Sequence, residues 1–167
     1  PTGIDKDGRD RTAVCCLSSL NLEKYDEWKD DPNMIGDVMR FLDNVLTDFI
    51  NKAPEQFRDA KYSAERERSV GLGVMGFHSF LQKKRIPLES VMAKSWNKKI
   101  FKQIDEQVNQ ASKDLAEERG ACPDAAEYGF KERFSNKTAI APTASISIIC
   151  GGASPGVEPI AANSYTH

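Results

Sequence analysis

The chain has 167 residues, of which 40% are hydrophobic and 29% are charged, and its formal net charge is -2. A chain of this size and composition can form one folded domain. Its nearly balanced charge, without a basic block, argues against a nucleic-acid-binding surface. It has no apolar run of about 20 residues that would cross a membrane and no signal or transit peptide, so we expect a cytoplasmic protein.

The first third of the sequence predicts a loop, a strand and a helix in that order. Residues 1–12 are polar and contain glycines, so we expect a loop or disorder there. Residues 12–17 are a short apolar, partly β-branched run, which predicts a buried strand. Asn33 is a good N-cap for an amphipathic helix that ends near residues 51–54.

Residues 64–84 predict a second helix, because their apolar residues recur at helical spacing. Gly71, Gly73 and Gly76 are poor helix formers, and they predict that another backbone approaches closely. They also match the G-x-G-x-x-G pattern of dinucleotide-binding folds. Because no strand is predicted before them, helix packing is the better interpretation.

The last part of the chain predicts a long helix followed by irregular structure and a strand. The helix spans residues 89–118 and is followed by Gly120, a typical residue beyond a helix end. Residues 124–137 are expected to be irregular, and residues 138–149 predict a second strand, interrupted by a proline. Residues 150–167 are rich in Gly, Ala, Ser and Pro and are expected to be loop or disordered.

The predicted fold class is α/β, with the order strand, three helices, strand. Two separated strands cannot close a sheet by themselves, so we expect a single partial domain within a larger α/β architecture. The sequence begins with Pro1 instead of Met, which also favours a segment of a longer protein.

The four cysteines, Cys15, Cys16, Cys122 and Cys150, contain no C-x-x-C pair, so no zinc site is predicted. A disulfide-stabilised scaffold is not expected in a chain with a sizeable core. Each cysteine taken alone is typical of a small buried hydrophobic residue. If residues 12–17 form a strand, Cys15 and Cys16 point to opposite faces, and at most one of them faces a given site.

The segment from residue 141 to residue 147 reads Ala-Pro-Thr-Ala-Ser-Ile-Ser and is the best candidate for chemistry. Its hydroxyls and backbone N–H groups, next to a glycine-rich turn, are suitable donors for a phosphate group. A Ser/Thr-rich strand end without a ligand explains the same residues equally well. The segment lacks the Walker pattern and is not a P-loop.

Other polar residues suggest less. His78 has no second His or Cys nearby and is expected to be structural. The charged residues 65–68 are expected to form a solvated face or a helix cap. Glu158 lies in an apolar stretch, and its spacing assigns it no role.

Five motifs, in order, resemble the catalytic α chain of class I ribonucleotide reductases. They are residues 13–22 (A-V-C-x-L-x-S-L-x-L in the family), 68–76, 119–123, 140–145 together with 157–159, and 163–166. The family reduces ribonucleotides to deoxyribonucleotides by thiyl-radical chemistry inside a ten-stranded α/β barrel. The resemblance therefore implies that this chain is a mostly helical segment of that barrel.

The resemblance also implies roles for individual residues. Cys15 matches the second of two cysteines that reduce the substrate, and its partner lies outside this chain, whereas Cys16 is a bystander. Cys122 matches a turn position, and Cys150 matches no catalytic position. The phosphate-binding segment of the family matches Pro142, Thr143, Ala144, Ser145 and Ile146, with Thr143 and Ser145 as hydroxyl donors and Ile146 donating only its backbone N–H.

The resemblance implies further components that the sequence does not contain. The N-x-C-x-E loop that carries the thiyl radical is absent, so we expect this chain alone to be inactive. We expect no cofactor or metal in the chain, a radical supplied by a separate metal-containing β subunit, and thioredoxin or glutaredoxin as reductant. Expected partners are the rest of the α chain, the β subunit, a ribonucleoside diphosphate and a second copy, but neither nucleic acid nor a membrane.

Two other interpretations stay open at this point. The chain can be a natural split subunit that assembles with a separate N-terminal polypeptide. It can also be a helical nucleotide-binding module without catalysis. The P-T-A-S segment favours class I over the cobalamin-dependent class II, and the sequence alone leaves that choice open.

Overall fold

The computed structural model describes residues 2–162 and 164, which form four short strands and several helices. The strands are β1 (Gly3–Ile4), β2 (Asp10–Arg11), β3 (Cys16–Asn21) and β4 (Val70–Met75). The helices are α1 (Tyr25–Trp28), α2 (Met34–Lys52), α3 (Arg58–Glu67), α4 (Phe77–Lys83), α5 (Val91–Arg119), α6 (Pro123–Glu127) and α7 (Ala144–Ile149), with 3-10 turns η1 (Leu22–Lys24) and η2 (Glu55–Phe57).

The centre of the molecule is a parallel strand pair, β3 and β4, in which Cys16 lies opposite Val70. A third segment continues the sheet beyond β4, because the N–H of Leu72 donates to Lys137 and the N–H of Ala139 donates back to Leu72. Strand β4 therefore lies between two neighbours, and all six of its residues are buried. A strand covered on both faces is typical of parallel sheets in α/β proteins.

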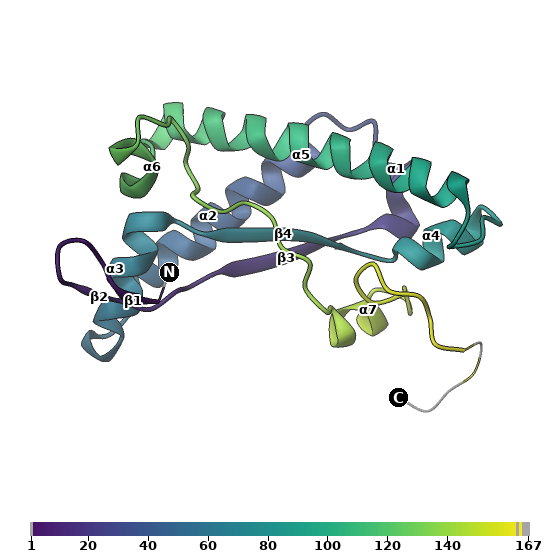
Figure 1. Cartoon of the computed structure of the whole chain (residues 1–167), viewed down its shortest axis with the longest axis horizontal. Helices are drawn as coiled ribbons and strands as arrows, with labels where there is room; N and C mark the ends of the chain where they lie inside the picture. Colours follow the sequence, from purple (N-terminus) through teal and green to yellow (C-terminus); the bar gives the residue numbers. More distant parts are fainter. Residues whose placement is uncertain (1, 163, 165–167) are drawn as a thin grey trace.

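Helices α2 and α5 cover one side of this sheet, while α7 lies on the opposite side (Figure 1). Because parallel strands need a crossover connection, α2 and α3 link β3 to β4 in the manner of a βαβ unit. The core between helices and sheet contains the inward side chains Leu20, Ile35, Met39, Leu42, Leu46, Leu72, Val74, Ile100, Ile104, Val108 and Leu115.

The two long helices were predicted within a few residues. Helix α2 follows Asn33 directly, and α5 ends at Arg119, after which Gly120 has a φ of 88°. The close approach predicted for the glycines is also confirmed. A Cβ atom on Gly73 would lie 2.1 Å from the backbone oxygen of Ala139, so this strand tolerates only glycine beside the third segment.

Two predicted elements were wrong. Residues 64–84 do not form one helix but the end of α3, strand β4 and α4. The apolar spacing was misleading, because a strand buried on both faces is continuously apolar and lacks the alternation that identifies a half-buried strand. Residues 138–149 form a single bridge at Thr138 and then helix α7, not a strand.

Smaller differences occur near the ends of the chain. The first strand of the sheet starts at Cys16, four residues later than predicted, and β1 and β2 pair as a short antiparallel hairpin where a loop was expected. Residues 150–162 consist of turns and bends, as expected for a loop. The motif residues Asn163, Tyr165 and Thr166, and also His167, lie outside the described residues.

Candidate functional site

The two faces of β3 have different environments. Cys16 and Leu20 pack against the core beneath the helices, whereas Cys15 and Leu17 are exposed on the opposite, open face. The alternation of a strand explains this division, and it confirms that Cys15 and Cys16 point in opposite directions. The open face therefore presents Cys15, which directly precedes β3, followed by Leu17 and Ser19 of β3.

Cys15 lies beside the start of β4. Its Sγ is 3.2 Å from where a Cβ of Gly71 would stand, so the glycine leaves room for the thiol. Partial desolvation raises the pKa of the Cys15 thiol, a hydrogen bond with Ser69 lowers it, and the negative charge of Glu67 raises it, so the net pKa lies above the ordinary value. Cys15 has no disulfide partner among the described residues.

The segment predicted to bind phosphate lies on the same open face. Thr143 is buried in a left-handed conformation with a φ of 55°, and it immediately precedes α7. The backbone N–H groups of Ala144, Ser145 and Ile146 are the first three of this helix, and such groups have no partner within a helix. Ala144, Ser145 and Ile146 are all exposed, so a hydroxyl and N–H donors lie together at the surface.

A hollow of about 200 Å³ lies between β3 and the segment predicted to bind phosphate. Leu17, Ser18 and Ser19 of β3 line one side, and Ala141 and Thr143–Ile146 line the other. Cys15 precedes Ser19 by four residues, which span roughly 13 Å of extended chain. The structure thus brings Cys15 and residues 142–146 to one face of the sheet, although 126 residues of sequence separate Cys15 from Ala141.

The rest of the C-terminal segment is fastened to α4. Ser154 and Ser79 exchange hydrogen bonds between hydroxyl and N–H, and the N–H of Gly76 donates to the Ser154 carbonyl. Nδ1 of His78 accepts a hydrogen bond of 3.0 Å from the N–H of Ile160, which confirms its structural role. Glu158 is exposed, and no side-chain contact assigns it a role.

Comparisons with known proteins agree with this geometry. The family described as "Ribonucleotide reductase, barrel domain" matches residues 4–132 of the chain. The chain belongs to this family. Among its relatives is the ribonucleoside-diphosphate reductase large subunit of Invertebrate iridescent virus 6, 53% identical over 93% of this chain and 16% of the viral protein.

A solved structure and a second relative extend the comparison. The class Id ribonucleotide reductase α subunit of Actinobacillus ureae is 42% identical, with a TM-score of 0.85, and the match covers 91% of this chain and 29% of that one. A vitamin B12-dependent reductase from Thermoplasma acidophilum is 39% identical over 90% of this chain and 20% of its own length. The chain therefore spans less than a third of the length of each of these relatives.

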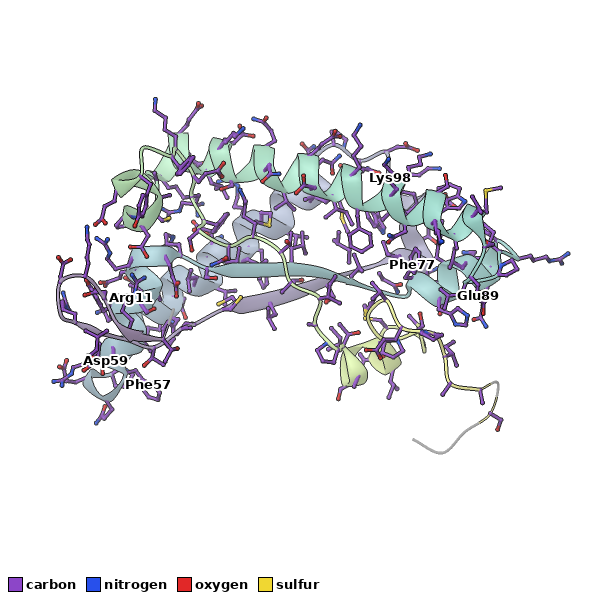
Figure 2. The ribbon with its side chains drawn as sticks, viewed as in Figure 1. Arg11, Phe57, Asp59, Phe77, Glu89 and Lys98 are labelled. Atoms are coloured by element: carbon purple, nitrogen blue, oxygen red, sulfur yellow. The ribbon has the colours of Figure 1, made fainter. Side chains whose placement is uncertain are left out.

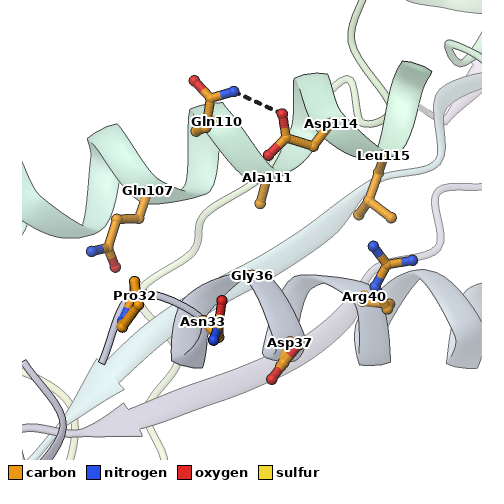
Figure 3. Close-up of a pocket in the computed structure, with 10 residues that line it drawn as sticks. All are labelled: Pro32, Asn33, Gly36, Asp37, Arg40, Gln107, Gln110, Ala111, Asp114 and Leu115. Carbon is orange, nitrogen blue, oxygen red and sulfur yellow. Dashed lines mark hydrogen bonds between the residues drawn. The ribbon is translucent and has the colours of Figure 1, made fainter. Parts of the chain in front are cut away.

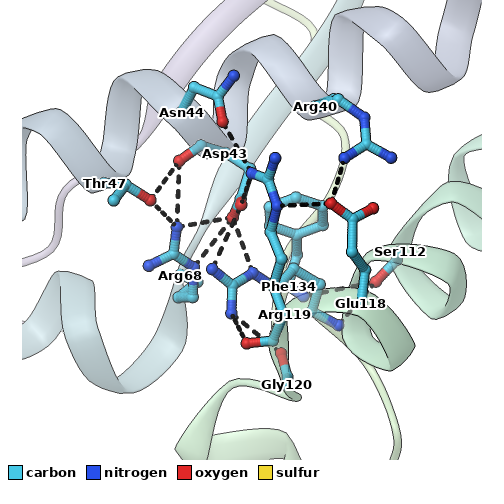
Figure 4. Close-up of polar contacts among 11 residues, drawn as sticks. Arg40, Asp43, Asn44, Thr47, Arg68, Ser112, Glu118, Arg119, Gly120 and Phe134 are labelled. Atoms are coloured by element: carbon cyan, nitrogen blue, oxygen red, sulfur yellow. Dashed lines mark hydrogen bonds and ion pairs between the residues drawn. The ribbon is translucent and has the colours of Figure 1, made fainter.

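Two of the motifs shared with the reductase family build a buried charge cluster on the helix side of the sheet (Figure 4). Asp43 of α2 is fully buried and accepts hydrogen bonds from Arg68 at 2.6 Å, Arg119 at 2.8 Å and Arg133 at 2.9 Å. Burial alone raises the pKa of Asp43, but the hydrogen bonds from Arg133 and Arg119 and the charge of Arg68 lower it further than burial raises it. The cluster ties α2, α5 and the start of β4 together.

This cluster corrects the prediction of a solvated face for Glu67 and Arg68, whereas Glu65 is exposed and Arg68 is the C-cap residue of α3, as the helix-cap alternative predicted. Arg68 is 8% exposed and Glu67 is 3% exposed, so neither belongs to a solvated face. Sequence periodicity did not predict their burial, because buried ion pairs contain the same residue types as charged surfaces. The motif beginning at Arg68 was the available signal, since its arginine precedes a buried strand.

A second charged cluster lies at the end of the molecule that holds α3 and α6, where Figure 2 labels Arg11. Arg11 pairs with Asp124 at 2.6 Å, and Arg66 pairs with both Asp124 and Glu127. These pairs fix the N-terminal hairpin and α6 against α3. They lie away from the hollow described above and serve the scaffold.

The groove between α2 and α5 is polar but holds no arrangement of reactive groups (Figure 3). Gln110 and Asp114 bond to each other there, and Arg40 pairs with Glu118. Within residues 2–162 and 164, no three His, Cys, Asp or Glu side chains gather as metal ligands. The helices of the described segment are also too short or too polar to cross a membrane.

Proposed function

We propose that this chain is the part of a ribonucleoside-diphosphate reductase α subunit that supplies one redox-active thiol, Cys15, and the binding site for the substrate's phosphate groups, residues 142–146. One observation carries the proposal. Cys15 and residues 142–146 share the open face of the β3–β4 sheet, and a single hollow adjoins both strand and segment. An extended nucleoside diphosphate can place its phosphates at one end of that face and its ribose toward the other.

The proposed phosphate site contains hydrogen-bond donors instead of positively charged side chains. The first three residues of α7 are exposed, so their N–H groups and the hydroxyl of Ser145 are available to an anion. Ile146 contributes only its N–H, because its side chain is apolar. The hollow is lined by uncharged residues, so these dipoles supply the attraction for the phosphates.

Cys15 supplies one of the two thiols that the reduction consumes. When two thiols form a disulfide they release two electrons and two protons, and reduction of the substrate takes up both. The family resemblance implies that the partner thiol comes from outside this chain, and the core position of Cys16 and the burial of Cys122 are in line with that proposal. The radical-bearing cysteine, the β subunit with its metal and the thioredoxin or glutaredoxin reductant are likewise separate components of the proposed reaction.

The exposed apolar side chains support assembly with the rest of an α subunit. Leu17 on the open face is 54% exposed, and Phe41 and Val45 on α2 are 61% and 39% exposed. Such residues in neighbouring positions are typical of surfaces that another part of the protein covers. We propose a cytoplasmic class I enzyme that acts as an oligomer, with the P-T-A-S sequence of residues 142–145 favouring class I.

The decisive experiment uses the assembled reductase, meaning this segment together with the polypeptide that supplies the rest of the α subunit. We expect Cys15→Ser to abolish thioredoxin-dependent turnover, while the matched variant Cys16→Ser retains it. Intact turnover in Cys15→Ser would show that the assignment is wrong. Ser145→Ala should weaken binding of a ribonucleoside diphosphate in isothermal titration, and binding of the nucleoside without phosphates should not change.

A further inference from the structure

Thr143 has an unusual backbone conformation for a β-branched residue. Its φ is 55° and its ψ is 24°, the left-handed region that β-branched residues rarely adopt. Such a conformation persists only where the surrounding structure holds it, and it is common at ligand-binding sites. The contacts that hold Thr143 in this conformation therefore fix the position of the first turn of α7.

The hydroxyl of Thr143 is engaged inside the protein. The backbone N–H of Gly156 donates to Thr143 Oγ1 at 2.7 Å, and Thr143 is only 8% exposed. Gly156 has a φ of 50°, and a Cβ on it would lie 3.3 Å from the carbonyl oxygen of Ala141. The turn at residue 156 thus lies directly against the backbone that enters the phosphate segment.

The same turn is fastened at its other end. Ser154 exchanges two hydrogen bonds with Ser79, at 2.9 Å and 3.1 Å, and its carbonyl accepts from the N–H of Gly76 at 2.7 Å. Gly76 directly follows β4, so this contact begins at the end of the central strand. Two sets of hydrogen bonds, joined by the backbone of residues 154–156, therefore link the end of β4 to Thr143.

We infer that Thr143 is a positioning residue that holds the phosphate-binding N–H groups of α7 in place through its hydrogen bond with Gly156, and that it is not itself a phosphate ligand. This inference rests on the function proposed above for residues 142–146. It departs from the expectation that the Thr143 hydroxyl contacts the phosphate, because that hydroxyl is buried against the turn. Ser145 is then the hydroxyl donor of the segment.

The test measures hydrogen exchange and ligand binding on the assembled reductase. Thr143→Val keeps the β-branched shape and removes the hydroxyl. We expect exchange at the Gly156 amide, followed by mass spectrometry, to accelerate about tenfold and affinity for a ribonucleoside diphosphate to fall roughly three- to tenfold. Affinity for the nucleoside without phosphates should stay constant, and Thr143→Ser should restore both properties. Unchanged Gly156 exchange in Thr143→Val would overturn the inference.

Two further variants separate this inference from the proposed function. Ser154→Ala removes the hydrogen bond that the Ser79 N–H donates to the Ser154 hydroxyl at the other end of the same turn, so it should weaken diphosphate binding in the same direction. The double variant Thr143→Val/Ser154→Ala should lose less binding free energy for the diphosphate than the sum of the two single losses. Additive losses would show that the two residues do not act through the same turn. If Ser145→Ala weakens diphosphate binding but Thr143→Val does not, only the positioning role of Thr143 is contradicted. If neither weakens it, the phosphate site is wrong.

Discussion

The polar groups on the two sides of the β3–β4 sheet differ in burial and in bonding partners. On the helix side, the buried carboxylate of Asp43 has three arginine partners within 2.9 Å. On the open side, Cys15 and the first three residues of α7 are exposed. The polar groups of the scaffold therefore find their partners within this segment, while the open face, proposed to be the reactive one, leaves its polar groups exposed.

The largest effect is expected from breaking the charge cluster. Asp43→Asn keeps the shape of the side chain but leaves three arginines without their shared negative charge. Removing one partner from a buried ion cluster costs about 3–5 kcal/mol, because the remaining charges stay desolvated. Urea unfolding followed by tryptophan fluorescence reports this, since Trp28 and Trp96 pack in the core.

The matched control is Asp48→Asn on the same helix. Asp48 is exposed and pairs with Lys52, so its loss should change the free energy of unfolding by less than about 0.5 kcal/mol. Equal changes in the free energy of unfolding would mean that the buried charge cluster does not stabilise the helix side of the molecule.

Acid should weaken the helix side selectively. The pKa of Asp43 is lower in the folded chain than in the unfolded chain, so its stabilising contribution is present above the unfolded value, about 3.9, and is lost as pH falls through the folded value. The difference in unfolding temperature between the wild type and Asp43→Asn should therefore shrink as pH falls below about 4. A constant difference across that range would contradict the assignment of the charge.

A glycine substitution probes how tightly the sheet is packed. An added Cβ at position 73 would lie 2.1 Å from the backbone oxygen of Ala139, so Gly73→Ala must displace the third segment of the sheet. Overpacking of this kind costs about 1–3 kcal/mol. Gly36→Ala on α2 meets no atom within 4 Å and should instead stabilise the chain by about 0.5–1 kcal/mol. The same unfolding measurement compares the two, and a neutral Gly73→Ala would show a loosely packed sheet.

Sequence reasoning predicted the two halves of the molecule unequally well. Helices α2 and α5 were predicted because each has one apolar face, and the α/β class followed from the predicted order of strands and helices. Strand β4 was missed, because its burial on both faces removes the period-two signal. Helix α7 was missed for a different reason: Pro142 and the hydroxyl residues suggested a strand end, whereas the left-handed Thr143 starts a helix.

The candidate site was predicted by motif rather than by physics. Residue spacing alone left Cys15 and Cys16 equivalent, and only the family pattern chose Cys15. The structure supplies what neither the spacing nor the pattern contained, which is the pairing of β3 with β4 that places Cys15 and the phosphate segment on one face. Pairing between residues more than fifty positions apart leaves no local trace in a single sequence.

The smallest expected effect concerns the chemistry of the open face. A hydrogen bond with Ser69 lowers the pKa of the Cys15 thiol against the effect of desolvation, so Ser69→Ala should raise that pKa further. Less thiolate then exists at any pH below the pKa, and the thiolate is the species that reacts. We expect alkylation of Cys15 by iodoacetamide near pH 8 to slow by about two- to tenfold.

Tandem mass spectrometry separates Cys15 from Cys16 in this measurement, and Ser19→Ala serves as the control, since Ser19 lies on the same face four residues further along the chain. The stability of the chain should not change in either variant. If the rate–pH profile of Cys15 is the same with and without the Ser69 hydroxyl, the hydrogen bond with Ser69 does not affect the pKa of the Cys15 thiol. A shifted profile would show that the open face, although incomplete, already adjusts the residue proposed to carry its redox chemistry.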